Sequence, residues 1–189
     1  MKIGVLAVQG AFIEHRNKLE ALGATCVELR KKEDLRNDLD GLVLPGGEST
    51  VQGKLLRELD MFDDLRDRIA NGVPVLATCA GLILLAEKLS NDNHVYFGTL
   101  PVTVRRNAYG RQLGSFHVSQ EMKGIGIVPM TFIRAPYIES VGGRVEILAE
   151  VDGNIVAVRY GVQFAMSFHP ELDSDTRIHQ MFLDACQER

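Results

Sequence analysis

A cysteine stands at the point where an apolar strand pattern gives way to a helical one. Residues 74–78 predict a buried strand, and Cys79 follows them directly, next to the small residues Ala80 and Gly81 that a tight turn needs. Open α/β folds place their sites at this carboxyl edge of the sheet. The helix N-terminus favours a thiolate, and the amides just after Cys79 could stabilise an oxyanion. Cys79 is therefore a candidate nucleophile, with a buried core cysteine as the alternative.

A histidine and a glutamate two residues apart could serve such a thiol. His169 and Glu171 flank Pro170, which restrains the backbone between them. In an extended segment, residues two apart face the same side, so Glu171 can lie beside His169. A histidine would take the thiol proton and return it to the leaving group, while a carboxylate fixes its tautomer. An isolated His-x-Glu is more often a strand-end histidine beside an exposed glutamate, so this interpretation depends on Cys79.

A pair of glycines follows another apolar strand pattern. Residues 42–44 predict a buried strand, and Gly46 and Gly47 come shortly after it. Two glycines let backbone amides approach a ligand closely. Ser49 or Thr50 is expected to cap the helix that follows. Taken alone, such a segment is more often a plain strand-to-helix turn with a cap than a ligand site.

The elements that must position these residues alternate along the first half of the chain. Strands alternating with helices predict a three-layer α/β fold, with a mostly parallel central sheet and helices on both faces. Strands are expected at residues 3–8, 25–29, 42–44 and 74–78, and helices at 11–22, 51–59, 62–71 and 80–89.

The second half predicts an antiparallel extension of that sheet. The clearest signal is Asp152-Gly153, which joins two alternating runs within residues 145–160 and is typical of a hairpin. Further strands are expected at residues 102–105, 126–134 and 163–168, and a closing helix at 175–187. With no internal repeat and no linker-like tract, residues 1–189 are expected to form one domain.

Composition excludes several classes of function. The chain has 189 residues, 46% of them hydrophobic, and a formal net charge of −4, which gives no electrostatic case for binding nucleic acid or an anionic membrane. The three cysteines, Cys26, Cys79 and Cys186, fit neither a disulfide framework nor a CxxC metal site. We therefore expect a protein of the reducing cytoplasm, without a signal peptide or a transmembrane segment.

The order Gly-Gly, Cys, His-x-Glu resembles that of class I (triad) glutamine amidotransferases, which have a flavodoxin-like fold. Finer matches over nearly the whole chain resemble the glutaminase subunits of pyridoxal 5′-phosphate synthases. One departure is Ala77, where that family usually has glycine, and we expect it to tune the turn without abolishing activity. The matching segments are AVQGA at 7–11, EH at 14–15, PGGEST at 45–50, TCAGL at 78–82, RRNAYGRQ at 105–112, FIRAP at 132–136 and SFHPEL at 167–172.

The resemblance implies a role for each motif. Cys79 would be the nucleophile that forms a glutamyl thioester, and His169 and Glu171 would complete its triad. The amides of Gly47 and Ala80 would form the oxyanion hole. An arginine suits the carboxylate of glutamine because it can make charge-assisted contacts with it. The glutamine pocket would comprise Gly47, Glu48, Ser49, Arg106, Arg134 and Ala135.

The same resemblance implies partners and no cofactor. Ammonia released from L-glutamine would pass to a separate (β/α)₈ barrel subunit that makes pyridoxal 5′-phosphate, and docking of that subunit would rearrange the Gln9-Gly10 peptide. No metal or cofactor is expected in this chain. His94, His117 and His179 are expected to be structural or surface residues, and His15, without triad context, to lie near the partner interface.

Three other functions remain as alternatives. The chain could be the glutaminase of another synthase, against which the Gln9-Gly10 and 105–112 segments argue. It could be a non-catalytic regulatory module of the same fold, although all three triad residues are present. It could also be a cysteine hydrolase of peptides, but the glycine pair and the two arginines suit a small amino-acid substrate better.

Overall fold

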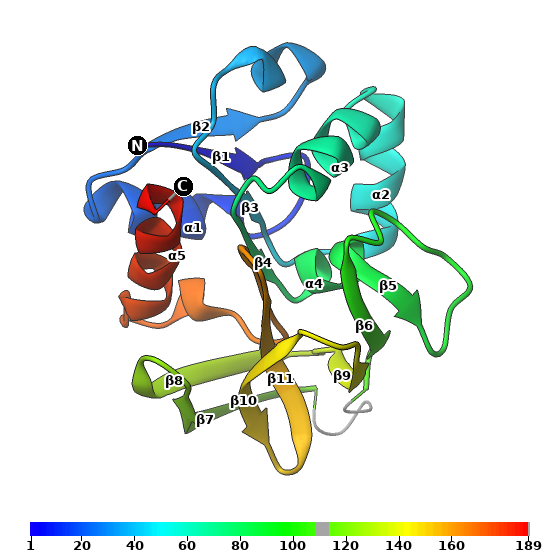
Figure 1. The fold of residues 1–189 in the computed structure, drawn as a ribbon, viewed down its shortest axis with the longest axis vertical. Coiled ribbons are helices and arrows are strands. Elements are labelled where there is room, and N and C mark those ends of the chain that lie inside the picture. The colour runs from blue at the N-terminus through cyan, green and yellow to red at the C-terminus, as the bar shows by residue number, and fades with distance from the viewer. Residues whose placement is uncertain (109–113, 189) are drawn as a thin grey trace.

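The computed structural model describes residues 1–108 and 114–188 (Figure 1). Residues 109–112 of the RRNAYGRQ motif therefore lie outside the described residues. Within the described part, ten strands form one mixed sheet, in which nine follow the order β2-β1-β3-β4-β12-β11-β9-β6-β5 and β10 pairs with β11. The predicted α/β fold with a mostly parallel sheet and an antiparallel extension is confirmed.

The parallel part of the sheet carries the three candidate motifs. All four of its internal pairings run parallel, and its central strands are apolar and fully buried, as expected for strands covered on both faces. The carboxyl ends of these strands therefore meet at one edge. The strands are β1 (Lys2–Leu6), β2 (Thr25–Leu29), β3 (Gly41–Leu44), β4 (Val75–Thr78) and β12 (Gln163–Met166).

Helices cover the two faces of this sheet. On one side lie α1 (Phe12–Ala21) and α5 (Arg177–Gln187), and on the other lie α2 (Ser49–Glu58), α3 (Phe62–Ala70) and α4 (Ala80–Leu85) (Figure 1). Two hydrophobic cores result, one under each helix layer. Short 3₁₀ helices occupy η1 (Lys32–Arg36) and η2 (Pro170–Leu172).

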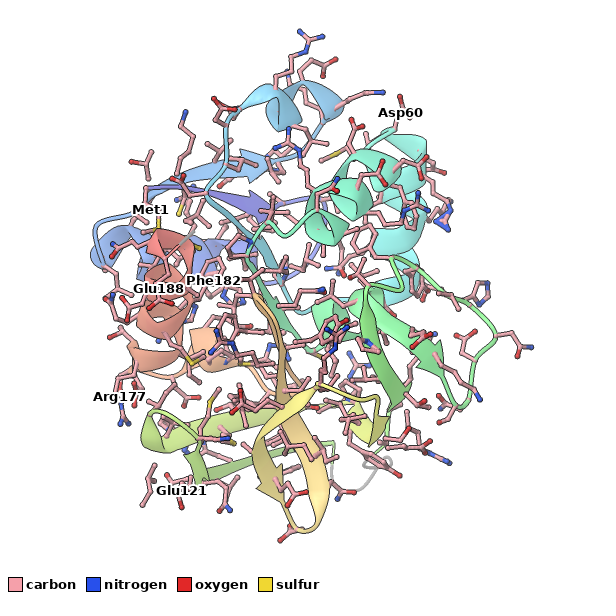
Figure 2. The ribbon with its side chains drawn as sticks, viewed as in Figure 1. Met1, Asp60, Glu121, Arg177, Phe182 and Glu188 are labelled. Carbon is pink, nitrogen blue, oxygen red and sulfur yellow. The ribbon has the colours of Figure 1, made fainter. Side chains whose placement is uncertain are left out.

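The side chains of α5 show how such a helix divides between core and surface. Phe182 is fully buried in the core with Ile3, Val43 and Leu76 of the sheet. Arg177, at the start of the helix, projects from the outer edge of the molecule (Figure 2). One face of α5 therefore packs on the sheet while the other meets solvent, as the sequence pattern predicts.

The antiparallel extension continues the sheet beyond β12. Its antiparallel strands are β6 (Leu100–Arg105), β9 (Tyr137–Val141), β10 (Glu146–Val151) and β11 (Asn154–Tyr160), and β5 (Ala86–Leu89) pairs in parallel with β6 at its end. A separate hairpin is formed by β7 (Ser115–Met122) and β8 (Gly126–Ile133). The predicted turn between β10 and β11 is confirmed, because Asp152 and Gly153 both have positive φ angles, +50° and +78°, as a type I′ turn requires.

Two local predictions are wrong. The helix expected at residues 80–89 ends at Leu85, and Ala86–Leu89 is strand β5, because it pairs with β6 at the end of the sheet. Neither Ser49 nor Thr50 caps α2; Glu48 is the N-cap residue, and no side chain in the described part of the protein caps this helix. Among the described residues, no helix is long and apolar enough to cross a membrane.

Candidate active site

Cys79 occupies a sharp strand-to-helix turn between β4 and α4. Its φ is +49°, a conformation that residues other than glycine rarely adopt and that strains the backbone. Its amide donates to Met166 O at 2.9 Å, which anchors the turn to β12. A Cβ atom on Gly81 would lie 2.1 Å from Leu44 O, so only glycine lets α4 approach β3 this closely. The predicted tight turn at Cys79 is confirmed.

His169 links Cys79 to Glu171. Its Nδ1 lies 2.6 Å from Glu171 Oε1, which leaves Nε2 for the hydrogen bond with the Cys79 side chain. Burial alone would lower the pKa of His169, but the hydrogen bonds and charges of Cys79 and Glu171 raise the pKa to about 10. The imidazole is thus protonated at neutral pH. The structure brings the three predicted triad residues together.

Gly46 lies directly against this triad. A Cβ atom on Gly46 would lie 2.3 Å from His169 Cε1 and 3.3 Å from Cys79 Cβ. The first distance is far below normal carbon–carbon contact, so no side chain fits there without moving the imidazole. The first glycine of the pair is therefore needed because the histidine packs on its backbone.

The loop that contains Gly46 and Gly47, here called the glycine loop, is hydrogen-bonded to the loop after β1. Ala11 N donates to Gly46 O at 3.0 Å, and Glu48 N donates to Gln9 Oε1 at 2.8 Å. Gln52 Nε2 donates to Gln9 O at 3.0 Å and to Pro45 O at 3.2 Å. A movement of the Gln9-Gly10 peptide would therefore act directly on the residues beside the candidate nucleophile.

The two predicted oxyanion donors are the backbone amides of Gly47, in the glycine loop, and of Ala80, which follows Cys79. Ala80 is the first residue of α4, so its N–H has no acceptor within the helix. The carbonyl of Gly46 accepts a hydrogen bond from Ala11 N. The peptide bond between Gly46 and Gly47 is trans, so its N–H, which belongs to Gly47, points in the opposite direction, away from Ala11. Both amides are thus backbone groups with fixed directions.

Arg106, predicted to hold the substrate carboxylate, already has an acidic partner. Its Nη1 lies 2.5 Å from Asp92 Oδ2, and its Nη2 lies 3.5 Å from Thr50 Oγ1 at the start of α2. The hydrogen bonds that His94 donates, followed by that of Arg106, lower the pKa of Asp92 to about 2. Asp92 is therefore ionised under ordinary conditions and competes for the guanidinium.

The remaining predicted pocket residues lie on two neighbouring loops and at the start of α2. Ala108 N donates to Ala135 O at 3.2 Å, which joins the turn after Arg106 to the turn after β8. Arg134, in that second turn, has a φ of +42°. Ser49 is buried, and its Oγ atom has no hydrogen-bond partner among the described residues, whereas the side chain of Glu48 is exposed. The structure thus links the loop of Arg106 to the loop of Arg134 through backbone atoms.

A comparison with protein families identifies the chain. The model of the SNO glutamine amidotransferase family matches residues 5–188. The chain belongs to this family. It is 68% identical over 185 residues to the pyridoxal 5′-phosphate synthase subunit PdxT of Desulfitobacterium hafniense, covering 98% of this chain and 93% of that protein. It is 53% identical over 192 residues to the protein of the same description from Streptococcus pneumoniae, covering 100% and 99% of the two chains.

Solved structures agree with the family. A crystal structure of a glutamine amidotransferase superposes with a TM-score of 0.92 at 44% identity, covering 98% of both chains. The structure of PurLQS from Thermotoga maritima has a TM-score of 0.72 at 15% identity, with 97% of both chains covered, and shares the fold. The amidotransferase fold expected from the sequence is confirmed.

Sequence reasoning misplaced one histidine of this amidotransferase. His15 was expected to lack triad context and to lie near a partner interface, but it is fully buried, with Nε2 3.3 Å from Glu171 Oε2. The signal was present in the helical spacing, because Phe12, His15, Leu19 and Leu22 fall on one stripe. Asp92 and Gln52 are also missed, and no local pattern marks them, while Thr78 belongs to the TCAGL motif but has no predicted role.

Proposed function

We propose that this chain is the glutaminase subunit of a pyridoxal 5′-phosphate synthase and that it hydrolyses L-glutamine to L-glutamate and ammonia. The observation that carries the proposal is the connected set of Cys79, His169 and Glu171 at the carboxyl edge of the sheet. The names of the relatives that cover nearly the whole chain support the synthase assignment. Residues 1–189 would form a single glutaminase domain.

The reaction follows from the positions of the triad. The sulfur of Cys79 attacks the side-chain amide carbon of glutamine, and the resulting oxyanion accepts hydrogen bonds from the amides of Gly47 and Ala80. Protonated His169 donates its proton to the departing nitrogen, which leaves as ammonia. His169 then takes a proton from water, whose oxygen attacks the glutamyl thioester, and glutamate and the thiol are released. Glu171 holds the imidazole throughout.

Substrate binding is the part of the proposal that involves the arginines. Arg106 would exchange Asp92 for the substrate carboxylate, with Arg134 and Ala135 beside it and with Gly47, Glu48 and Ser49 on the other side. The buried Oγ of Ser49, which has no partner within residues 1–108 and 114–188, supports a polar ligand on that side, because buried hydroxyl groups normally have partners.

Activity would depend on the barrel subunit that receives the ammonia. The three hydrogen-bonded links between the Gln9–Ala11 segment and the glycine loop give a docking partner a route to the oxyanion donors. One added donor is worth about 10²–10³ in rate. Because the nucleophile must stay a reduced thiol, we also propose a cytoplasmic location.

The test is ammonia release from glutamine by the chain alone and with a saturating barrel subunit. We expect stimulation of about 10²–10³ by the partner and loss of activity in Cys79→Ala. Cys26→Ala and Cys186→Ala, which change the other two cysteines, are the matched controls and should hydrolyse glutamine normally. Retention of most activity in Cys79→Ala would refute the mechanism, and equal rates with and without the partner would refute the gating alone.

A further inference from the structure

A buried polar network continues beyond the triad into the helices on one face of the sheet. His15 of α1 and His179 of α5 are both fully buried, and His15 Nδ1 lies 2.9 Å from His179 Nε2. The other ring nitrogen of His15, Nε2, lies 3.1 Å from Thr78 Oγ1 and 3.3 Å from Glu171 Oε2. Thr78 Oγ1 in turn accepts from Gly46 N at 3.1 Å. His15 thus contacts both the triad carboxylate and the residue that holds the glycine loop.

The neighbours of His15 determine which of its nitrogens carries the proton. Burial lowers the pKa of His15, and burial together with His15 lowers the pKa of His179 to about 2, so both rings are neutral. Nε2 of His15 lies beside a carboxylate, which can only accept, and beside Thr78 Oγ1, which can accept or donate, so we assign the N–H to this nitrogen. Nδ1 is then the acceptor, and His179 Nε2 donates to it.

One carboxylate oxygen of Glu171 lacks a hydrogen-bond donor among the described residues. Its Oε1 is taken by His169, while its buried Oε2 makes no hydrogen bond of good geometry with the described residues. An unsatisfied buried carboxylate oxygen is costly, and His15 Nε2 is the nitrogen placed against it, 3.3 Å from Oε2 and 3.1 Å from Thr78 Oγ1, so its N–H lies between these two acceptors. A neutral donor favours the ionised carboxylate without adding a charge that would compete with the imidazolium of His169.

We propose that His15 is a positioning residue of the triad, which holds the Glu171 carboxylate through Nε2–H and is itself fixed by His179. The inference deepens the proposed glutaminase function and rests on it. Loss of the donor would let Glu171 rotate or bind a proton, and His169 would then lose its orientation. The effect should fall on the chemical step, because the ring nitrogens of His15 face Glu171, Thr78 and His179, which all lie outside the proposed glutamine pocket.

The alternative is a bridge that serves stability alone by joining α1 to α5. Four variants of the complex with the barrel subunit separate the two roles. His15→Leu removes the donor and keeps the bulk, and His15→Gln can place an N–H near the position of Nε2, whereas His15→Asn is too short to do so. Leu19→Ala is the matched control, since Leu19 is equally buried and lies one turn further along the same helix.

A positioning role predicts a specific pattern in steady-state glutamine hydrolysis. His15→Leu should lower kcat by about 10- to 100-fold, the range typical of residues that hold an active-site group by a hydrogen bond, with little change in KM. His15→Gln should recover most of that loss and His15→Asn should not. Leu19→Ala should lower the thermal midpoint without lowering kcat. If His15→Leu does not fold, the comparison of His15→Gln with His15→Asn decides.

A double-mutant cycle with Glu171→Ala gives the second test. If His15 acts through Glu171, His15→Leu should have little further effect once Glu171 is alanine, whereas independent roles would add. The measured quantity is the rate at which iodoacetamide alkylates Cys79, detected as the increase in mass of the peptide that contains Cys79. This readout does not need turnover, so it also works in variants that hydrolyse glutamine very slowly. Additive effects, or equal kcat values for His15→Leu and the unmodified chain, would overturn the inference.

The two proposals can fail separately. If the unmodified complex releases no ammonia from glutamine, the proposed function is wrong. If it is active and the His15 variants do not follow the expected pattern, the function stands and the positioning role is wrong.

Discussion

The proposed triad lies on the parallel part of the sheet, whereas the two arginines lie at the ends of antiparallel strands. Cys79 and His169 are buried, hydrogen-bonded to each other and packed on Gly46. Arg106, by contrast, is paired with Asp92 on a partly exposed loop. The groups proposed to perform the chemistry are therefore already in place, while the group proposed to bind substrate has to change its partner.

This difference follows from what each region is made of. Parallel strands buried on both faces fix the directions of the loops at their carboxyl ends, and α4 and α2 start directly after the motifs. The arginines follow β6 and β8, whose turns contain the positive φ angles of Asn107 (+48°) and Arg134 (+42°). We expect mutations in the first region to change kcat and mutations in the second to change KM.

The largest effect is expected within the triad. His169→Ala should lower kcat by about 10⁴–10⁶, nearly as much as loss of the nucleophile, because the residues of a triad act as a unit. Glu171→Ala should cost less, since Glu171 orients the base without transferring the proton. Both are measured by ammonia release from the complex with the barrel subunit. A larger loss in Glu171→Ala than in His169→Ala would reverse the roles assigned to them.

Gly46→Ala tests whether the buried region is as tightly packed as the structure indicates. The added methyl group would lie 2.3 Å from His169 Cε1, so the imidazole must move. A shift of about 1 Å at a catalytic group can cost about 10²-fold in rate, and we expect a loss of that order in kcat.

The matched control is Gly143→Ala, where an added Cβ would meet no atom within 4 Å. It should leave both kcat and stability nearly unchanged. Normal turnover in Gly46→Ala would show that the triad tolerates displacement, and the contrast between the two regions would disappear.

The same contrast explains how much the sequence could predict. Cys79, His169 and the glycine pair follow buried strands, and that local pattern was enough to place them at one edge. The position of Asp152-Gly153 was predictable for a similar reason, because a type I′ turn has its own residue preferences. In each case the information lies within a few adjacent residues.

Contacts between distant segments could not be predicted in this way. Ala86–Leu89 continues a helical pattern, yet it forms β5 because β6 offers it a pairing edge. Ser49 has the residue type of a helix cap, but it lies inside the helix and Glu48 is the N-cap residue. The contact of His15 with Glu171 joins the first helix to a segment near the end of the chain, and nothing local marks this pairing.

Arg106→Ala tests the second region, which is proposed to bind the substrate. Loss of a charge-assisted contact to the glutamine carboxylate should raise KM by about 10- to 100-fold, with a smaller change in kcat. Arg105→Ala is the matched control, because this neighbouring arginine is half exposed and lies 3.5 Å from Glu139. An unchanged KM in Arg106→Ala would remove this arginine from the pocket.

The smallest effect is expected when the competing carboxylate is neutralised. In Asp92→Asn, Arg106 no longer has to leave an ionised partner before it binds substrate, so KM should fall. An ion pair near the surface is worth up to about 1 kcal/mol, which corresponds to a decrease in KM of about fivefold at most. Lowering the pH cannot replace the mutation, because the pKa of Asp92 is about 2 and the carboxylate stays ionised well below neutral pH. The measurement is KM for glutamine in the complex, with kcat as the internal control. A rise in KM would instead mean that Asp92 helps to bind the substrate, and the ammonium group of glutamine is its natural partner. The second region would then bind both charges of the amino acid, the carboxylate through Arg106 and the ammonium group through Asp92.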